Sequence, residues 1–91
     1  MTDVVIVDSV RTGLAKAFRG SFNLTRSDDM VAHCIDALLD RNPAVSPDEV
    51  EDVIVGAASH VGEQDGNLAR LAVVLSKLPI TTAGMTINRE Y

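Results

Sequence analysis

Cysteine, aromatic residues and long apolar runs are scarce in this 91-residue sequence. Its one cysteine, Cys34, excludes an internal disulfide and a cysteine-based zinc site. There is no tryptophan, one tyrosine and two phenylalanines, so the core has to be built from aliphatic side chains and Met. The apolar run near the N-terminus, Val4–Val7, is too short for a signal or membrane-spanning segment. We therefore expect a cytoplasmic protein without a membrane partner.

Basic residues are also fewer than acidic ones, 8 against 13. The net charge of −5 argues against nucleic acid or an anionic membrane as a partner. The charges are unevenly placed: residues 11–26 hold four bases and no acid, whereas residues 28–65 hold ten acids and one base, Arg41. The basic stretch could meet an anionic ligand, but such runs are more often solvated loops.

Three apolar segments have the composition of strands that are buried on both faces, which is typical of parallel sheets. These predicted strands are Val4–Val7, Asp52–Ala58 and Gly84–Arg89. A capping box with proline at its first helical position, Ser46-Pro47-Asp48-Glu49, predicts a single helical turn just before the second strand.

Two segments between the strands have apolar residues at helical spacing. Thr25 or Ser27 can cap the first helix, and Asn42-Pro43 ends it. Asn67 can cap the second helix, which ends before Pro79. The predicted apolar stripe of the first helix is Met30, Val31, Cys34, Ile35, Leu38 and Leu39, and that of the second is Leu68, Leu71, Ala72, Leu75 and Leu78.

The β-α-β-α-β order predicts an α/β fold with a parallel three-stranded sheet. If the strands step across the sheet in one direction, right-handed crossovers put both helices on one face. The other face would then be bare, although its strands are apolar on both sides, and the first strand would keep an open edge. We therefore expect residues 1–91 to be one incomplete domain, the first part of a larger one.

Residues that often carry chemistry are present, but no constellation stands out. Gly62–Asn67 lies between a strand and a helix, where phosphate loops lie, but it lacks their glycine and lysine patterns, and a capping turn is the better interpretation. Cys34 lies on an apolar stripe and is predicted to be a buried, inert thiol, with His33 solvated beside it. No metal or cofactor site is predicted.

Four side chains lie near the carboxyl ends of the predicted strands, where the sites of parallel sheets gather. They are Asp8, Arg11, His60 and Arg89. His60 has no partner fixed by spacing, so catalysis by it is not predicted. Asp8 and Arg11 are predicted to form an ion pair that holds the loop after the first strand.

Four ordered motifs resemble the thiolase family, and they span the whole chain. DVVIVDSVRTGLAKAFRGSF resembles the first strand and its R-T-P-[IVM]-G loop, with Gly13 in place of the proline. VSPDEVEDVIVGAAS resembles the second strand with its lead-in, and GEQDGNLARLAVVLSKLP resembles a G-x-x-x-x-N-x-A-R helix start. MTINRE resembles the third strand, T-[VI]-N-[RK]-x-C. In detail the motifs are most similar to those of bacterial 3-ketoacyl-CoA thiolases.

The resemblance implies acyl transfer between 3-ketoacyl-CoA and CoA, as in fatty-acid β-oxidation, with coenzyme A as a substrate and no cofactor. A cysteine nucleophile carries the acyl group as a thioester, which divides a C–C cleavage into two easier steps. In the family pattern this cysteine falls at the position that Tyr91 occupies here. A phenol, with a pKa of about 10, cannot replace a thiolate at neutral pH. Either the cysteine is replaced, or the chain is cut just before it.

The resemblance implies supporting roles, near the active site or at a dimer contact, for a few residues only. They are Gln64, Asn67, Arg70, Asn88 and Arg89. No residue matches a catalytic one, so we expect the chain alone to be inactive. The implied partner is the remainder of a thiolase chain or a homo-oligomer, a dimer or tetramer. The alternative is a truncated, non-catalytic module that assembles with a thiolase through its third strand, or, more weakly, a structured remnant without function.

Overall fold

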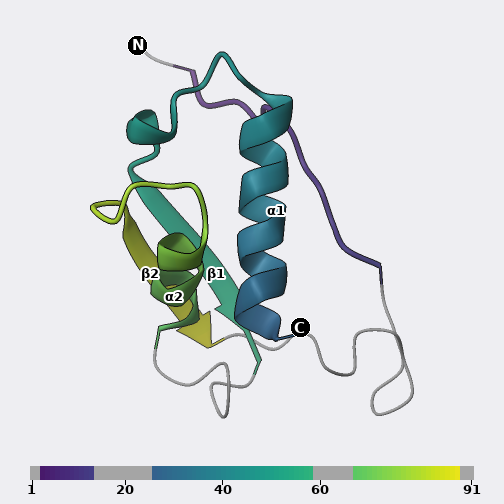
Figure 1. Ribbon diagram of the computed structural model, residues 1–91, viewed down its shortest axis with the longest axis vertical. Coiled ribbons are helices and arrows are strands. Elements are labelled where there is room, and N and C mark those ends of the chain that lie inside the picture. Colours follow the sequence, from purple (N-terminus) through teal and green to yellow (C-terminus); the bar gives the residue numbers. More distant parts are fainter. Residues whose placement is uncertain (1–2, 14–25, 59–66, 89–91) are drawn as a thin grey trace.

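The computed structural model describes residues 3–13, 26–58 and 67–88, which form a small α/β unit (Figure 1). The elements are α1 (Ser27–Arg41), the 3₁₀ turn η1 (Pro47–Glu49), β1 (Asp52–Ala57), α2 (Leu68–Leu75) and β2 (Ala83–Asn88). The two strands pair in parallel, with Asp52 opposite Ala83 and Ala57 opposite Asn88. Of the described helices, none is long and apolar enough to cross a bilayer.

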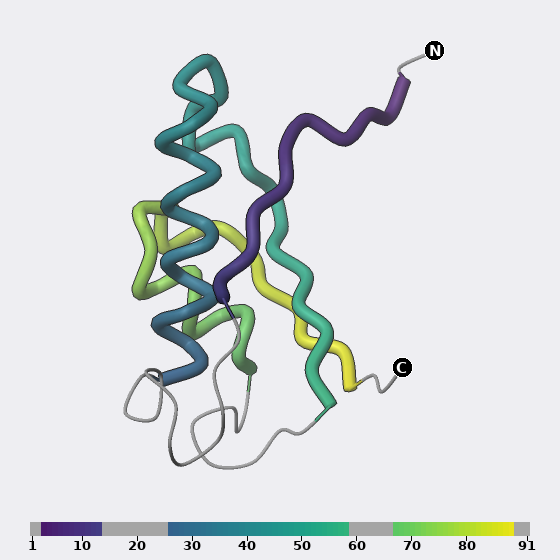
Figure 2. Tube along the Cα trace, turned by 90° about the vertical axis from the view of Figure 1, so that its right-hand side faces the viewer, coloured from purple at the N-terminus to yellow at the C-terminus, as the bar shows by residue number. Residues whose placement is uncertain are grey.

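Both helices lie on the same side of the sheet, as predicted (Figure 2). Helix α2 packs on both strands, and α1 packs on α2. The core lies between the helices and the sheet and consists mainly of small and aliphatic side chains. Its buried apolar residues are Ala32, Ala57, Leu68, Ala69, Ala72, Val73 and Leu78. The opposite face of the sheet carries no helix among the described residues.

The strand predicted at Val4–Val7 is not formed in this structure. Residues 3–13 have extended backbone without strand pairing, and the four apolar side chains are between 68% and 99% exposed. The described sheet therefore has two strands and not three. Asp8 ties this segment to the C-terminal end of α1, and the segment runs past α1 and β1 without joining the sheet (Figure 2).

Helix α1 begins and ends close to the predicted positions, but its cap differs. The N-cap is Arg26, without a side-chain capping bond, so Ser27 is not the cap; Thr25 lies outside the described residues. Within the first turn, Asp28 Oδ1 accepts the N–H of Asp29 at 2.9 Å. The Asp28 carboxylate also receives two bonds of 3.0 Å from the Arg26 guanidinium. Helix α1 stops at Arg41, just before Asn42.

The predicted capping box is confirmed at η1. Ser46 Oγ accepts the N–H of Asp48, and Glu49 Oε1 accepts the N–H of Ser46, both at 3.4 Å. Strand β1 ends at Ala57, one residue before the predicted end.

The predicted cap of α2 is confirmed, but its predicted stripe is only partly right. Asn67 caps the helix, whereas Leu71 and Leu75 are 41% and 50% exposed. The buried face includes Ala69 and Val73 in their place, both fully buried. Small side chains on this face allow α2 to lie close to β2, whereas Leu71 and Leu75 face outward and Leu68 is buried.

Candidate functional site

Two of the five predicted supporting residues meet where α2 begins against β2. Asn67 caps α2, and Arg70 lies one turn into the helix. Asn88 is exposed at the carboxyl end of β2, opposite Ala57. Gln64 and Arg89 lie outside the described residues, as do His60 and Tyr91.

Asn67 is bonded to both elements at this junction. Its Oδ1 accepts the N–H of Arg70 at 3.1 Å and the hydroxyl of Thr86 at 2.7 Å. Its Nδ2 donates to the carbonyl oxygen of Gly84 at 2.9 Å. The Thr86 Oγ1 in turn accepts the N–H of Ala69 at 2.9 Å. We call Asn67, Ala69, Arg70, Gly84 and Thr86 the polar clamp.

At Gly84, the backbone of β2 lies directly against the backbone of α2. A Cβ on this residue would lie 2.8 Å from the backbone nitrogen of Arg70 and 2.9 Å from the carbonyl carbon of Ala69. Rigid backbone cannot yield at such a distance, so only glycine allows α2 to rest on β2 in this way.

The Arg70 side chain extends the clamp toward the start of β2. Its Nη1 donates to the carbonyl oxygen of Thr82 at 2.9 Å. Thr82 is only 3% exposed, and its hydroxyl donates to the carbonyl oxygen of Val50 at 3.4 Å. Arg70 thus fixes the backbone just before β2.

The polar clamp distinguishes the two interpretations of the start of α2, an anion-binding site or a capping turn. An anion site there would need free N–H groups, but Ala69 donates to Thr86 and Arg70 donates to Asn67. The N–H of Leu71 donates to the Asn67 carbonyl oxygen. A capping role for Asn67 is therefore confirmed, while residues 62–66 lie outside the described part of the chain.

The predicted ion pair between Asp8 and Arg11 is wrong. Asp8 Oδ1 lies 3.2 Å from Nη2 of Arg41, and Asp8 Oδ2 accepts a 2.9 Å bond from Nδ2 of Asn42. The hydrogen bond from Asn42, and then that from the Ser9 N–H, hold the pKa of Asp8 below its ordinary value of 3.8. Arg11 is exposed. Sequence spacing favoured the nearer base, whereas the fold brings the end of α1 to Asp8.

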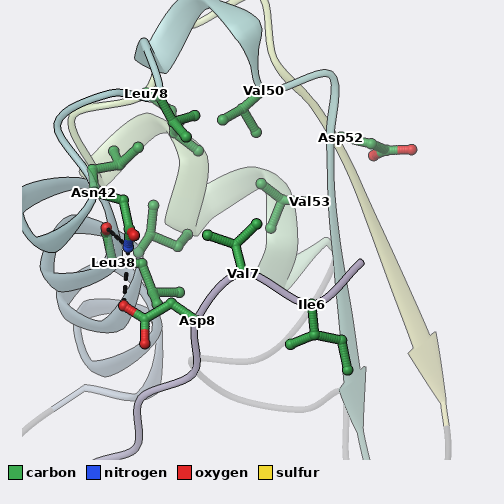
Figure 3. A pocket seen from close by; sticks show the side chains of 12 residues that line it. Ile6, Val7, Asp8, Leu38, Asn42, Val50, Asp52, Val53 and Leu78 are labelled. Atoms are coloured by element: carbon green, nitrogen blue, oxygen red, sulfur yellow. Dashed lines mark hydrogen bonds between the residues drawn. The ribbon is translucent and has the colours of Figure 1, made fainter. Parts of the chain in front are cut away.

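A cavity of about 470 Å³ lies between the N-terminal segment, α1 and β1 (Figure 3). Its walls are mostly aliphatic, and Asp8, Asn42 and Asp52 are the polar residues that line it. In Figure 3 the Asp52 side chain points away from the other side chains. No nucleophile faces an acid or base here, so the cavity offers an apolar volume and not a catalytic arrangement. The apolar lining residues are Ile6, Val7, Ile35, Leu38, Leu39, Val45, Val50, Val53 and Leu78.

Cys34 and His33 do not form a site together. Cys34 is half-buried and not fully buried as predicted, and it lines a small hollow with Thr12 and Met30. His33 is exposed, as predicted. Within residues 3–13, 26–58 and 67–88, no three His, Cys, Asp or Glu side chains are grouped so as to hold a metal ion.

A charged contact between α1 and the turn after α2 has no signal in the sequence. The N–H of Lys77 donates to Oδ1 of Asp36 at 2.7 Å, and Lys77 Nζ lies 2.9 Å from Oδ1 of Asp40. The hydrogen bond to Asp40 raises the pKa of Lys77. The two acids lie four residues apart on α1, a spacing that marks one helix face but does not identify the partner.

Comparison with known proteins shows which family the sequence belongs to. The sequence matches the family model described as "Thiolase, N-terminal domain" over residues 4–90. The chain belongs to the thiolase family. The matched residues include both helices, both strands and the whole polar clamp.

The known relatives of this chain are much longer than the chain. It is 43% identical over 89 residues to the 3-ketoacyl-CoA thiolases of Vibrio vulnificus (strain YJ016) and Aliivibrio salmonicida (strain LFI1238). The aligned stretch covers 98% of this chain but only 23% of either relative. The chain therefore spans less than a quarter of the length of these thiolases.

Proposed function

We propose that this chain is the N-terminal part of a thiolase-type acyltransferase that transfers an acyl group between 3-ketoacyl-CoA and CoA in fatty-acid β-oxidation. The observation that carries the proposal is the 43% identity to 3-ketoacyl-CoA thiolases across 98% of the chain. Coenzyme A is then a substrate, and the enzyme uses no cofactor. Its proposed location is the cytoplasm.

The chain's own contribution is to position the end of β2. The polar clamp holds β2 against α2 through Asn67, Gly84 and Thr86, and β2 ends at Asn88. Three residues later comes Tyr91, at the place where the resemblance puts the nucleophilic cysteine. Because a phenol is protonated at neutral pH, we propose that the chain alone has no thiolase activity. Asn67 and Arg70 support the site by fixing β2, without touching substrate.

A fusion enzyme tests this proposal. Residues 1–91 replace the matching stretch of the Vibrio vulnificus thiolase, with either Tyr91 or Tyr91→Cys, and thiolysis of 3-ketoacyl-CoA is measured. We expect turnover only with Tyr91→Cys, and none from the 91-residue chain alone. Equal turnover with Tyr91, or activity of the isolated chain that Cys34→Ala removes, would contradict the proposal.

We also propose that Val4–Val7 joins β1 as a third parallel strand when the domain is complete. Residues 3–13 run in the same direction as β1 (Figure 2), and Ile6 and Val7 line one cavity with Val50 and Val53 (Figure 3). Burying four β-branched side chains that are now exposed would stabilise this arrangement.

The second candidate function is a non-catalytic module that assembles with a thiolase partner, or with further copies in a dimer or tetramer. The observation that favours it is the exposure of Ile54, Met85 and Ile87 on a sheet face without a helix. The fusion enzyme discriminates the two candidates, because a module with a purely structural role gains no turnover from Tyr91→Cys.

A further inference from the structure

Thr86 is the last residue of β2 that bonds to α2 within the described part of the chain. Its hydroxyl donates to Asn67 Oδ1 at 2.7 Å and accepts the N–H of Ala69 at 2.9 Å. Both bonds join the strand to the first turn of the helix, and hydrogen bonds of this length are directional. A valine would fill the same space without them, so the hydroxyl fixes the orientation of the strand and does more than fill the core.

The helix end of this contact is held firmly in the core. Ala69 is fully buried and Leu68 is 2% exposed, so the first turn of α2 cannot move without disturbing the packing around it. In the plane of the sheet, β2 is held by its pairing with β1, which continues to Asn88 opposite Ala57. Perpendicular to the sheet, the bonds of Thr86 hold the strand to α2. The two sets of bonds together fix the carboxyl end of β2 in both directions.

The position of Thr86 in the sequence connects this contact to the proposed reaction. Residue 91, where the resemblance places the nucleophilic cysteine, comes five positions after Thr86. Catalytic groups have to be held in a reactive geometry, and a displacement of about 1 Å can slow a reaction about 100-fold. We propose that Thr86 is a positioning residue of the thiolase reaction, whose hydroxyl sets where β2 delivers the side chain of residue 91. This inference rests on the proposed function and deepens it by one residue.

The test uses the fusion enzyme with Tyr91→Cys, into which Thr86→Val and Thr86→Ser are introduced separately. Valine keeps the shape and removes both bonds, whereas serine keeps the hydroxyl. Thr82→Val is the matched control, because Thr82 is 3% exposed and lies just before the opposite end of β2, where its hydroxyl donates to the carbonyl oxygen of Val50. The kcat and KM of thiolysis are measured, and kcat is divided by the fraction of enzyme that 3-ketoacyl-CoA acylates, which intact mass gives. Circular dichroism checks the fold.

We expect Thr86→Val to lower the corrected kcat at least about tenfold and to change KM less than about twofold, because a displaced nucleophile weakens the transition state more than substrate binding. Thr86→Ser should return kcat to within about threefold of the parent fusion, and Thr82→Val should stay within about twofold of it.

A purely structural role of Thr86 would lower the acylated fraction and leave the corrected kcat unchanged, and that result would overturn the inference. So would equal losses of kcat in Thr86→Val and Thr82→Val, or a Thr86→Ser enzyme as slow as Thr86→Val. A Thr86→Val enzyme that does not fold would also overturn it, since the hydroxyl would then be needed for folding and not for position. Inactivity of the parent fusion contradicts the proposed function instead, so the two failures are distinguished.

Discussion

At the scale of single residues, the hydroxyl of Thr86 joins the two halves of the polar clamp. It donates to Asn67 Oδ1 and accepts from the N–H of Ala69. We expect Thr86→Val, which keeps the shape but removes both bonds, to lower the free energy of unfolding by about 1 kcal/mol. Thr86→Ser keeps the hydroxyl and is expected to retain most of the stability. Urea unfolding monitored by circular dichroism measures both, and an equal loss in the two variants would refute this role.

Gly84 and Gly56 form a matched pair for a second prediction. A Cβ at Gly84 meets backbone atoms at 2.8 and 2.9 Å, whereas a Cβ at Gly56 meets nothing within 4 Å. We expect Gly84→Ala to destabilise the fold by about 1–3 kcal/mol through overpacking, and Gly56→Ala to change stability by less than about 0.5 kcal/mol. Similar urea midpoints for the two variants would show that α2 does not rest on β2 as described.

The sequence alone was sufficient to predict part of the clamp. Asn67 was predicted as a cap because it precedes an apolar helical pattern, and local spacing determines capping. Its bonds to Gly84 and Thr86 depend on how α2 lies on β2, because these partners lie 17 and 19 positions further along the chain. Such tertiary contacts have no local pattern, and the same holds for the contact between Asp8 and Arg41.

At the scale of elements, Asp8 fastens the N-terminal segment to the end of α1. Its pKa is lowered, so the tether contributes stability above the ordinary carboxyl pKa of 3.8 and loses it as the pH falls through the lower value in the folded state. We expect the NMR signals of the Asn42 side-chain amide to shift below pH 3.8, as its acceptor becomes protonated. Asp8→Asn should abolish this shift. An unchanged pH profile in that variant would assign the shift to another group.

Helical spacing predicted the helices well, and apolar composition predicted two of three strands. The segment Val4–Val7 has the composition of a buried strand, but a strand also has to pair with a neighbouring edge, and in the described structure this segment does not pair with the edge of β1 that β2 leaves free. Such an edge belongs to tertiary structure and not to composition. In the same way, the stripe predicted for α2 included Leu71 and Leu75, whereas the face that packs in the fold contains Ala69 and Val73.

At the scale of the whole molecule, the described chain is an α/β unit with apolar surface left uncovered. Ile54, Met85 and Ile87 on the sheet and Val4–Val7 beside it are all exposed. The chain belongs to the thiolase family and spans less than a quarter of the length of its relatives; under the proposed function, further chain is expected to bury these surfaces. The sheet face without a helix could be predicted from the order of strands and helices alone, since that order puts both helices on one side of the sheet.

The most direct test of the central claim is the intact mass of the fusion enzyme after incubation with a 3-ketoacyl-CoA. With Tyr91→Cys, we expect an added acyl group that peptide mapping places on residue 91, because a thiolate there can form a thioester. With Tyr91 the mass should stay unchanged. An acyl adduct on Cys34, or no adduct on Tyr91→Cys in a fusion that folds, would contradict the assignment of this chain to the part of a thiolase that leads into the nucleophile.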